Sequence, residues 1–551
     1  MDVVVLEPRT GQLRAPKTST RALRVALIAP AGPASGHLQA LIRWLEASPA
    51  IELLGVAIDA TRPALPVWLQ GTGPISWLDR RRLSRHPVLA PHLIRQPLAV
   101  APPARAMTVA ELGATEVDIA ILLCDCDDVT QYAYLCSEGV ISIDPGPVDI
   151  DLAALRAIDR TQASLPFEIR LSTPDGASRS LLAGALGINR SIPQTGSAVL
   201  CRIVDMLRNL ITRRLQTGTW PEHVGDPPGA SAQIIRAAEN PANPGTDANA
   251  CASRLAFRYL GRRILGALRW HLKRRAGLDD IWRVGVARGH WTDADPADHI
   301  TVNGPDEGFL ADPFLLEHEG RRILFGEAMN PRTERGYIVA CELPDQGPAR
   351  LLGTALEEEF HLSFPYPFTY QGKLYMCPET HESGQIRVYA CEEFPLRWRL
   401  HTVLMDAVSA VDTMLFERDG RWWMLTNLDP AETGDLCSEL HLFHADSPLS
   451  EHWQPHPMNP LIIDPLRARN AGLIFDGARV FRVSQRQGFE RYGESIGINE
   501  IVRLDPDHYQ ERLVRQIEPS MVADASGMHH LHSCGSLTVF DYQQPRRPKH
   551  R

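Results

Sequence analysis

The chain has 551 residues, of which 44% are hydrophobic and 22% are charged, and its formal net charge is −9. This length exceeds one ordinary domain, and the composition is typical of a soluble globular protein. The negative net charge argues against a general nucleic-acid binder, so we expect no nucleic acid among its partners.

The ten cysteines are scattered along the chain without a CxxC pair, which predicts neither a disulfide framework nor a zinc module. The first thirty residues lack a basic segment followed by a long apolar one, and no apolar run reaches the length of a membrane span. We therefore expect a cytoplasmic protein. No motif in the sequence indicates a cofactor.

After an irregular arm at residues 1–20, residues 21–220 alternate buried strands with amphipathic helices. This βαβ order predicts an open α/β domain with a parallel sheet. The glycines of its first loop do not follow the dinucleotide-binding spacing. The expected strands are Val25–Ala29, Ile51–Ile58, 117–123 and 139–143, and the expected helices are His37–Ala47 and Val199–Leu215.

The expected strand at 139–143 runs into Ser142-Ile143-Asp144-Pro145-Gly146. Residues 24–220 here resemble the N-terminal domain of the formyltransferases that act on methionyl-tRNA and on amino sugars, in which this strand ends in Asn-Ile-His-Pro-Ser. The resemblance implies a formyltransferase-like fold. Ser142 stands at the Asn position and Asp144 at the His position, and neither can replace the amide donor or the proton-exchanging imidazole. We therefore expect a repurposed domain without formyl transfer.

Residues 221–250 are rich in Pro, Gly, Asn and Ala, which predicts a linker. A basic amphipathic helix is predicted next, at residues 251–278, because 254–275 contain no acid and carry apolar residues at helical spacing. Such a helix can lie on an anionic membrane surface, peripheral to the inner face of the membrane, or grip a phosphate-bearing substrate. Alternatively, it docks its apolar stripe between the two domains and leaves its arginines solvated.

Residues 279–545 repeat one unit that consists of an apolar strand, a Gly-containing turn, a second apolar strand and a polar residue. Successive units start about fifty residues apart, which predicts an all-β propeller of five four-stranded blades. We expect residues 282–289 to add a strand to the last blade and close the ring. The units are 309–327, 363–379, 411–427, 470–485 and, more weakly, 527–540.

The innermost strand of each propeller blade lines the central channel, so polar residues near the starts of the five units should converge at one end. Asp312 and Asp412 are the acidic residues among them, and Glu379 ends a second strand close behind. Glycosidic cleavage needs one protonated and one ionised carboxyl, and carboxylates that converge in a low-dielectric pocket push each other's pKa values apart.

A ring with these acidic residues resembles the five-bladed propeller glycosidases and transglycosylases, which include arabinanases, xylosidases, invertases and levansucrases. The resemblance implies that Asp312 is base or nucleophile, Glu379 the acid and Asp412 the residue that fixes orientation. In this chain Glu379 falls in the second blade and Asp412 in the third, which departs from the order in those families.

Further polar residues at the same end are candidates for substrate binding. Each has a structural alternative, because turn carboxylates, salt bridges and loop-pinning amides use the same residue types. His529, His530 and His532 could be zinc ligands, but strand alternation is expected to turn His530 away from the other two, so we expect no metal. The substrate-binding candidates are Glu327, Asn427, Arg469, Asn470, Gln485, Tyr492, His529 and His530.

The domain order, together with the motifs Phe-Leu-Ala-Asp-Pro-Phe, Ser-Phe-Pro-Tyr-Pro-Phe, Cys-Pro-Glu-Thr and Arg-Asn-Ala-Gly, resembles bacterial fusions related to the N-terminal region of plant glucosamine inositolphosphorylceramide transferase. This resemblance implies a role in glycoconjugate or surface-polysaccharide assembly, with a saccharide or glycoconjugate as substrate. Two hypotheses remain open. The propeller hydrolyses or transfers a glycosyl group, or the protein recognises a glycan or nucleotide sugar without catalysis.

Overall fold

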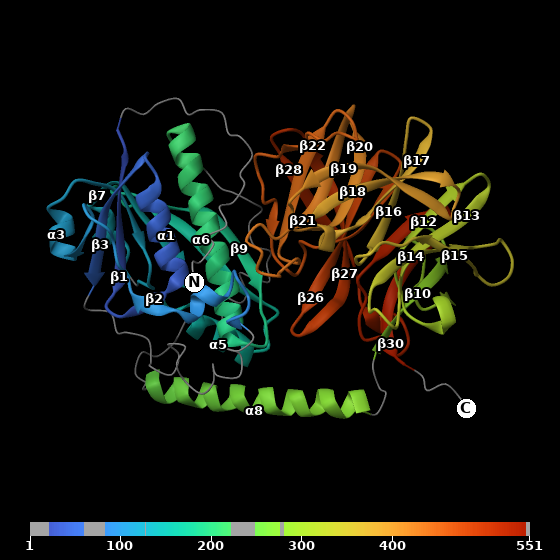
Figure 1. The fold of residues 1–551 in the computed structure, drawn as a ribbon, viewed down its shortest axis with the longest axis horizontal. Coiled ribbons are helices and arrows are strands. Elements are labelled where there is room, and N and C mark those ends of the chain that lie inside the picture. The colour runs from blue at the N-terminus through green and yellow to red at the C-terminus, as the bar shows by residue number, and fades with distance from the viewer. Residues whose placement is uncertain (1–20, 60–82, 127, 222–247, 276–279, 547–551) are drawn as a thin grey trace.

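The computed structural model describes residues 21–59, 83–126, 128–221, 248–275 and 280–546. In these residues an α/β domain and a β-propeller lie side by side, and a long helix runs along one edge of the molecule (Figure 1). The predicted arm at 1–20 lies outside the described residues, as does nearly all of the predicted linker at 221–250.

A mixed seven-stranded sheet forms the centre of the α/β domain. Its strand order is β5-β3-β1-β6-β7-β8-β9, in which the first five strands are parallel and the last two antiparallel. The predicted parallel strands are therefore present, whereas the β8–β9 hairpin at the edge was not predicted. The strands are β1 (Leu23–Pro30), β3 (Ile51–Asp59), β5 (Arg105–Thr108), β6 (Val117–Leu122), β7 (Cys136–Asp144), β8 (Ser164–Ser172) and β9 (Ser178–Gly187).

Helices pack on this sheet because each has one apolar face. The longest of them, α6 (Ile192–Thr217), begins where the Ser191 hydroxyl caps the Gln194 amide and ends at Gly218, whose φ is 79°. It contains the helix predicted at 199–215. The other elements of the domain are α1 (Gly36–Ala47), α3 (Val109–Gly113), α4 (Thr130–Ala133), α5 (Ile150–Asp159), η1 (Ala90–Leu93) and the short pair β2 (Pro33–Ser35) and β4 (Arg95–Pro97).

The propeller has five blades, as the repeat predicted. Blade one comprises β12 (Leu310–His318), β13 (Arg321–Met329), β14 (Gly336–Glu342) and β15 (Arg350–Leu356). Blade two comprises β16 (Ser363–Tyr370), β17 (Lys373–Glu379), β18 (Gln385–Glu393) and β19 (Arg397–Asp406). Blade three comprises β20 (Ala410–Arg418), β21 (Arg421–Leu428), β22 (Glu439–Ala445), β23 (Gln454–Pro455) and β24 (Ile462–Ile463).

Blade four comprises β25 (Asn470–Asp476), β26 (Arg479–Gly488), β27 (Arg491–Leu504) and β28 (Tyr509–Ile517). Blade five joins the two ends of the propeller sequence, because β10 pairs with β30 along its whole length. The closing strand predicted at 282–289 is therefore confirmed. This pairing closes the ring, because one blade contains strands from both ends of the propeller sequence. Blade five comprises β29 (Leu531–Cys534), β30 (Leu537–Pro545), β10 (Asp280–Arg288) and β11 (His299–Val302).

The innermost strand of every blade is interrupted at the same point by a bulge. In blades one to four two residues face one residue of the second strand, and in blade five residues 528–530 face residues 541–542, so the pairing register shifts by one in every blade. A bulge changes the direction in which the strand presents its side chains. The bulge residues are Asp312 and Pro313, Phe364 and Pro365, Asp412 and Thr413, Ala471 and Gly472, and His529 and His530.

Helix α6 and strand β9 join the α/β domain to the propeller. The Arg202 side chain of α6 is buried, and its guanidinium donates hydrogen bonds of 2.9 Å to Asp429 and 2.9 Å to Glu439. The Gly187 amide of β9 donates to the Ser438 hydroxyl at 3.1 Å. The contact therefore includes buried polar interactions.

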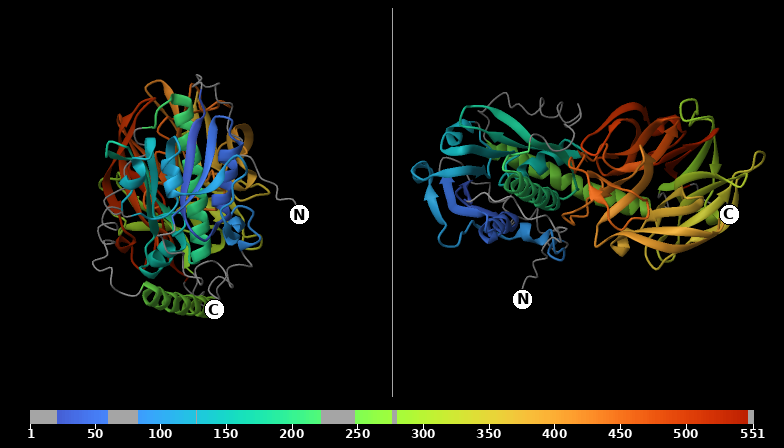
Figure 2. Two further views of the ribbon diagram at one scale, coloured as in Figure 1. Left: turned by 90° about the vertical axis from the view of Figure 1, so that its left-hand side faces the viewer. Right: turned by 90° about the horizontal axis from the view of Figure 1, so that it is seen from above.

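The long helix at the edge of the molecule is α8 (Ala248–Arg275), at the position of the basic helix predicted at 251–278. It lies below the rest of the described chain in Figure 1 and in the left-hand view of Figure 2. Of the helices in the described part of the chain, none combines the length and the hydropathy needed to cross a bilayer.

Candidate active site

A histidine that lies between two aspartate side chains marks the junction of blades one and five. The Nε2 atom of His529 lies 3.1 Å from Asp312 Oδ1, and its Nδ1 atom lies 3.1 Å from Asp541 Oδ1. The amides of Asp312 and Phe364 complete the network, donating to Asp541 Oδ2 at 3.0 Å and to Asp312 Oδ2 at 3.1 Å. Backbone and side chains thus hold the Asp312 carboxylate in one orientation.

The electrostatics of this network favour charged forms. Burial raises the pKa of Asp312, but the interactions with His529 outweigh this effect and lower the pKa to about 2. Burial lowers the pKa of His529, but the carboxylates of Asp541 and Asp312 outweigh this and raise it to about 10. Asp312 is therefore an anion and His529 a cation at neutral pH.

Blade three contributes a second buried carboxylate, Asp412, which is paired with Arg469. The guanidinium Nε donates to Asp412 Oδ2 at 2.6 Å, and Nη2 lies 3.5 Å from Oδ1. Burial raises the pKa of Asp412, Arg469 opposes this, and the negative charges of Glu379 and Asp312 add to it. Because the charges of Glu379 and Asp312 both act on Asp412, the three carboxyls belong to one electrostatic cluster.

Glu379 and Glu327 occupy equivalent places at the ends of the second strands of blades two and one. Glu379 is half-buried, and its Oε2 accepts a hydrogen bond of 2.7 Å from Ser363. Glu327 is buried, with Oε1 3.3 Å from the His361 ring. Burial raises the pKa of Glu327 to about 7, an effect that the His361 interaction opposes and the charge of Asp312 strengthens. The cluster thus contains carboxyls with well-separated proton affinities.

Aromatic side chains border the cluster. Tyr492 is 43% exposed, and its ring lies 5.2 Å from the Arg469 guanidinium and 5.2 Å from the His529 ring. The Trp282 ring lies 4.1 Å from the His529 ring, edge to face. Tyr492 combines exposure with contact to two charged groups, so it is the residue of this set best placed to meet a ligand.

Three of the predicted substrate-binding residues, Asn427, Asn470 and Gln485, form hydrogen bonds with the backbone of neighbouring strands and loops. The Asn427 amide donates to the carbonyls of Glu439 and Ala468 and accepts from the Asn470 amide. Asn470 in turn donates to the Asp412 carbonyl at 2.9 Å. These two buried asparagines hold strands together, and we do not assign them to ligand binding. Gln485 is also buried, and its backbone amide donates to the Arg469 carbonyl.

The three histidines of blade five differ from the prediction, which placed His530 apart from the other two. Instead, His530 and His532 share one neighbour, since their rings lie 4.5 and 5.3 Å from the Phe314 ring. Side chains two residues apart point to the same face of a strand, so alternation itself places His530 with His532 and leaves His529 apart, and the prediction misapplied this rule. Neither ring nitrogen of His530 has a hydrogen-bond partner among the described residues, and burial lowers its pKa to about 4.

The ligand atoms of Asp312, His529 and Asp541 lie within 4.8 Å of one another, a spacing that could suit a metal ion. Each ring nitrogen of His529 faces one of the two carboxylates, so the three side chains also form a network of their own.

Sequence reasoning missed several partners in this site. Asp541 faces the bulge of blade five, and it was missed because the bulge itself has no signal in the sequence. Cys437, whose sulfur lies 3.5 Å from Arg469 Nη1, and His361 come from loops outside the repeat and carry no such signal.

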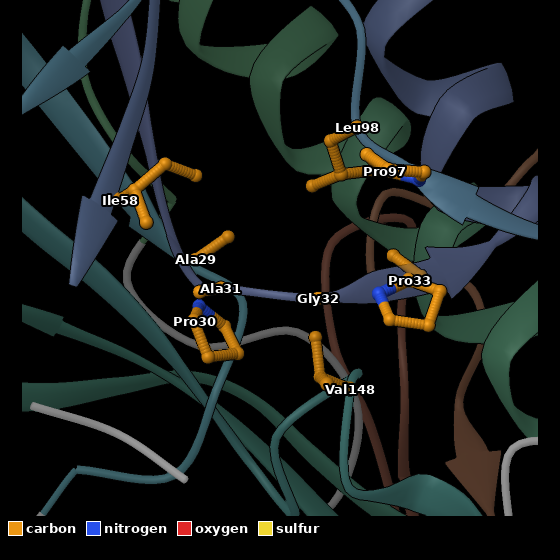
Figure 3. A pocket seen from close by; sticks show the side chains of 10 residues that line it. Ala29, Pro30, Ala31, Gly32, Pro33, Ile58, Pro97, Leu98 and Val148 are labelled. Atoms are coloured by element: carbon orange, nitrogen blue, oxygen red, sulfur yellow. The ribbon is translucent and has the colours of Figure 1, made fainter. Parts of the chain in front are cut away.

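The α/β domain holds a separate apolar cavity of about 220 Å³ (Figure 3). It lies at the carboxyl ends of β1 and β3, where open α/β sheets commonly bind ligands. Ser142 is half-buried in β7 and Asp144 is exposed at its end. The residues that line the cavity are Ala29, Pro30, Ala31, Gly32, Pro33, Ala34, Ile58, Pro97, Leu98 and Val148.

A buried polar network close to this cavity was also missed. His92 lies 3.1 Å from the Ser35 hydroxyl through Nδ1 and 2.9 Å from Asp151 through Nε2, and Arg95 pairs with the same aspartate. The Ser35 hydroxyl also accepts the His37 amide and so caps α1. The network therefore fastens the start of α1 to α5.

Comparisons with known proteins concern the propeller. Residues 289–529 match the family model described as "Glucosamine inositolphosphorylceramide transferase 1, N-terminal". The chain is 34% identical over 240 residues to glucosamine inositolphosphorylceramide transferase 1 of Arabidopsis thaliana, and 34% identical over 231 residues to the Oryza sativa subsp. japonica protein of that name. These alignments cover 42% and 40% of this chain and 31% and 30% of the relatives, so the chain matches about a third of their length.

The chain also aligns with solved structures, among them an arabinofuranosidase and a sucrose-6-phosphate hydrolase. The catalytic domain of Coprinopsis cinerea GH62 α-L-arabinofuranosidase is 13% identical, with a TM-score of 0.32, over 42% of this chain and 90% of that one. Sucrose-6-phosphate hydrolase from Lactobacillus gasseri is 15% identical, with a TM-score of 0.33, over 44% of this chain and 52% of that one.

Proposed function

We propose that the propeller hydrolyses or transfers a glycosyl group of a glycoconjugate or surface polysaccharide at the carboxylate cluster. The observation that carries this proposal is that Asp312 and Glu379 lie close enough to two further buried carboxyls, Glu327 and Asp412, for their charges to raise the pKa values of both. Glycosyl chemistry needs one carboxyl ionised and another protonated at the same pH.

Asp312 takes the role of base or nucleophile, because His529 keeps it ionised and the Phe364 amide orients it. Glu379 is the acid, since it is half-buried and so reaches both the cluster and solvent. In this scheme Glu379 protonates the glycosidic oxygen as the bond to the anomeric carbon breaks. Asp312 either bonds to that carbon and is then displaced by a water or hydroxyl whose proton Glu379 takes, or it takes the proton of the water or hydroxyl that bonds to the carbon directly.

Arg469 and Tyr492 supply the contacts that orient the sugar. Asp412 holds the Arg469 guanidinium at 2.6 Å and so acts as a positioning residue. The curated relatives are named glucosamine inositolphosphorylceramide transferases, and this name supports a saccharide or glycoconjugate substrate.

Recognition of a glycan or nucleotide sugar without catalysis is the second candidate. One observation favours it: Asp312 and Asp412 each already have a cationic partner, His529 and Arg469. Paired carboxylates of this kind are common in rigid binding scaffolds, where they fix loops.

The two candidates differ in what Asp312→Asn and Glu379→Gln should do. If the propeller is an enzyme, each variant should lower kcat about 10²–10⁴-fold while ligand binding persists, because the acid and base act in the transition state. The measurement uses a panel of 4-nitrophenyl glycosides for turnover and free oligosaccharides in calorimetry for binding. Glu319→Gln, an exposed carboxyl in the β12–β13 turn, is the control and should keep full activity.

Absence of turnover by the unaltered protein, together with oligosaccharide binding that Arg469→Met abolishes, would establish the recognition candidate instead.

A further inference from the structure

Helix α8 carries a row of large apolar side chains that point away from the rest of the molecule. Successive residues of this row lie seven, one, three and four positions apart, and this spacing places them on one side of the helix. They are between 54% and 79% exposed, and we refer to them as the outer stripe: Phe257, Ile264, Leu265, Leu268 and Leu272.

The opposite side of the helix is the one that contacts the protein. Tyr259 is buried, and its hydroxyl oxygen accepts the Ile192 amide at 3.4 Å. Arg258 lies 3.1 Å from Asp159, and Arg262 donates to the Ile158 carbonyl at 3.0 Å. The helix is therefore tethered by its first half to the end of α5 and to the start of α6. The docked arrangement, in which the apolar stripe is covered by the two domains, is not what the structure shows.

The helix that carries the outer stripe is strongly basic. Residues 254–275 contain eight lysines and arginines and no acid, in a chain whose net charge is −9. Arg269 and Arg275 are exposed in the half of the helix that carries Ile264 to Leu272. Gly261 lies within the same side, and a side chain added there would meet nothing within 4 Å. An exposed apolar face beside basic residues is complementary to a lipid bilayer, because the apolar side chains can contact acyl chains while the basic ones pair with anionic headgroups.

We propose that α8 holds the protein on an anionic lipid bilayer, with the outer stripe inserted at the boundary between headgroups and acyl chains and the arginines paired with lipid phosphates. The helix then lies parallel to the bilayer surface. Pairing with α8 of a second copy is the competing explanation for an exposed stripe, but it would bring two acid-free basic helices together, and their like charges repel.

Vesicle flotation of the full chain tests this proposal. The probes are phosphatidylglycerol–phosphatidylcholine vesicles and pure phosphatidylcholine vesicles, each at low and high salt. We expect binding to the anionic vesicles, weakened by salt and much lower on phosphatidylcholine alone.

Two double variants separate the apolar and electrostatic contributions. Leu268→Asn with Leu272→Asn should lower the partition coefficient by about tenfold or more, because two leucines no longer enter the bilayer. Arg269→Gln with Arg275→Gln should lower it about fivefold per arginine on anionic vesicles only. The matched control is Leu513→Asn, since Leu513 is 56% exposed on blade four and far from α8 in sequence; it should bind like the unaltered protein.

Circular dichroism spectra and thermal midpoints of all variants should match, because every substituted side chain is exposed. Equal flotation of the unaltered protein and the leucine variant would overturn the proposal. So would sedimentation equilibrium showing a dimer that the leucine variant loses, since that result would assign the outer stripe to a second copy.

Discussion

The central residue of the candidate site is His529, because it connects two carboxylates that would otherwise repel each other. Its two ring nitrogens lie 3.1 Å from Asp312 and 3.1 Å from Asp541, and all three side chains are buried. A buried ion pair is costly to break, since the remaining charge loses both water and partner. The network is therefore a requirement of the fold as well as of the proposed chemistry.

This arrangement predicts a specific pH dependence for the stability of the protein. The pKa of Asp312 falls to about 2, below the value of about 3.9 for an unfolded chain, so its contribution is present above pH 4 and is lost as pH falls through 2. The pKa of His529 rises to about 10 from about 6.5, so its contribution is complete below pH 6.5 and is lost as pH rises through 10.

His529→Gln should therefore lower the free energy of unfolding by about 3–5 kcal/mol between pH 4 and 6.5, and by less as the pH approaches 10. Urea unfolding at a series of pH values measures this difference. His508→Gln is the control, because His508 forms an exposed pair with Asp505 at 3.0 Å and should matter little. A deficit for His529→Gln that stays constant from pH 5 to 10 would indicate a neutral imidazole.

At the scale of elements, the recurring bulge is what brings the site together. It appears in the innermost strand of all five blades and contains Asp312, Asp412 and His529. The φ angles of Asp312 and Asp412 are 50° and 51°, in the left-handed region that non-glycine residues rarely occupy. Backbone strain of this kind is typical of functional sites.

Substitution of Gly472, which lies in the bulge of blade four, tests the importance of the bulge for ring closure. Its φ is 125°, and a Cβ there would lie 2.2 Å from the Leu531 carbonyl of blade five. Gly472→Ala should therefore lower the free energy of unfolding by about 3 kcal/mol or more, since backbone must move. Gly477→Ala, in a turn of the same blade with φ of 62° and nothing within 4 Å, should cost only about 1 kcal/mol.

Calorimetric or urea unfolding of both variants provides the comparison. Equal losses would mean that the approach of Leu531 is not tight and that the bulge of blade four is replaceable.

The elements that the sequence predicted correctly share a local signal. Strand periodicity and Gly-containing turns recur about every fifty residues, so the blades and the closing strand β10 could be identified without tertiary information. The bulges could not, because one extra residue leaves hydrophobic alternation almost unchanged over so short a strand. The partner of Arg469 could not be predicted either, because a guanidinium can bind a sugar, a phosphate or an aspartate. Only the fold shows that Asp412 lies beside it.

At the scale of the whole molecule, the contact between the two domains is an example of information that periodicity conceals. Arg202 lies in the amphipathic helix α6 among apolar residues, yet its side chain is among the most deeply buried in the described part of the chain. Its partners Asp429 and Glu439 flank the loop that carries Cys437, and Cys437 contacts Arg469 of the candidate site. The α/β domain thereby supports one wall of that site.

Arg202→Met should consequently destabilise the whole chain, because it leaves Asp429 and Glu439 buried without their shared cation, at a cost of about 3–5 kcal/mol. The matched control is Arg190→Met, which removes an exposed ion pair with Glu490 across the same two domains and should cost at most about 1 kcal/mol. Urea unfolding followed by circular dichroism measures both. Separate transitions in Arg202→Met would show that this arginine couples the domains, whereas equal midpoints for the two variants would mean that the apolar contacts of β9 and α6 suffice.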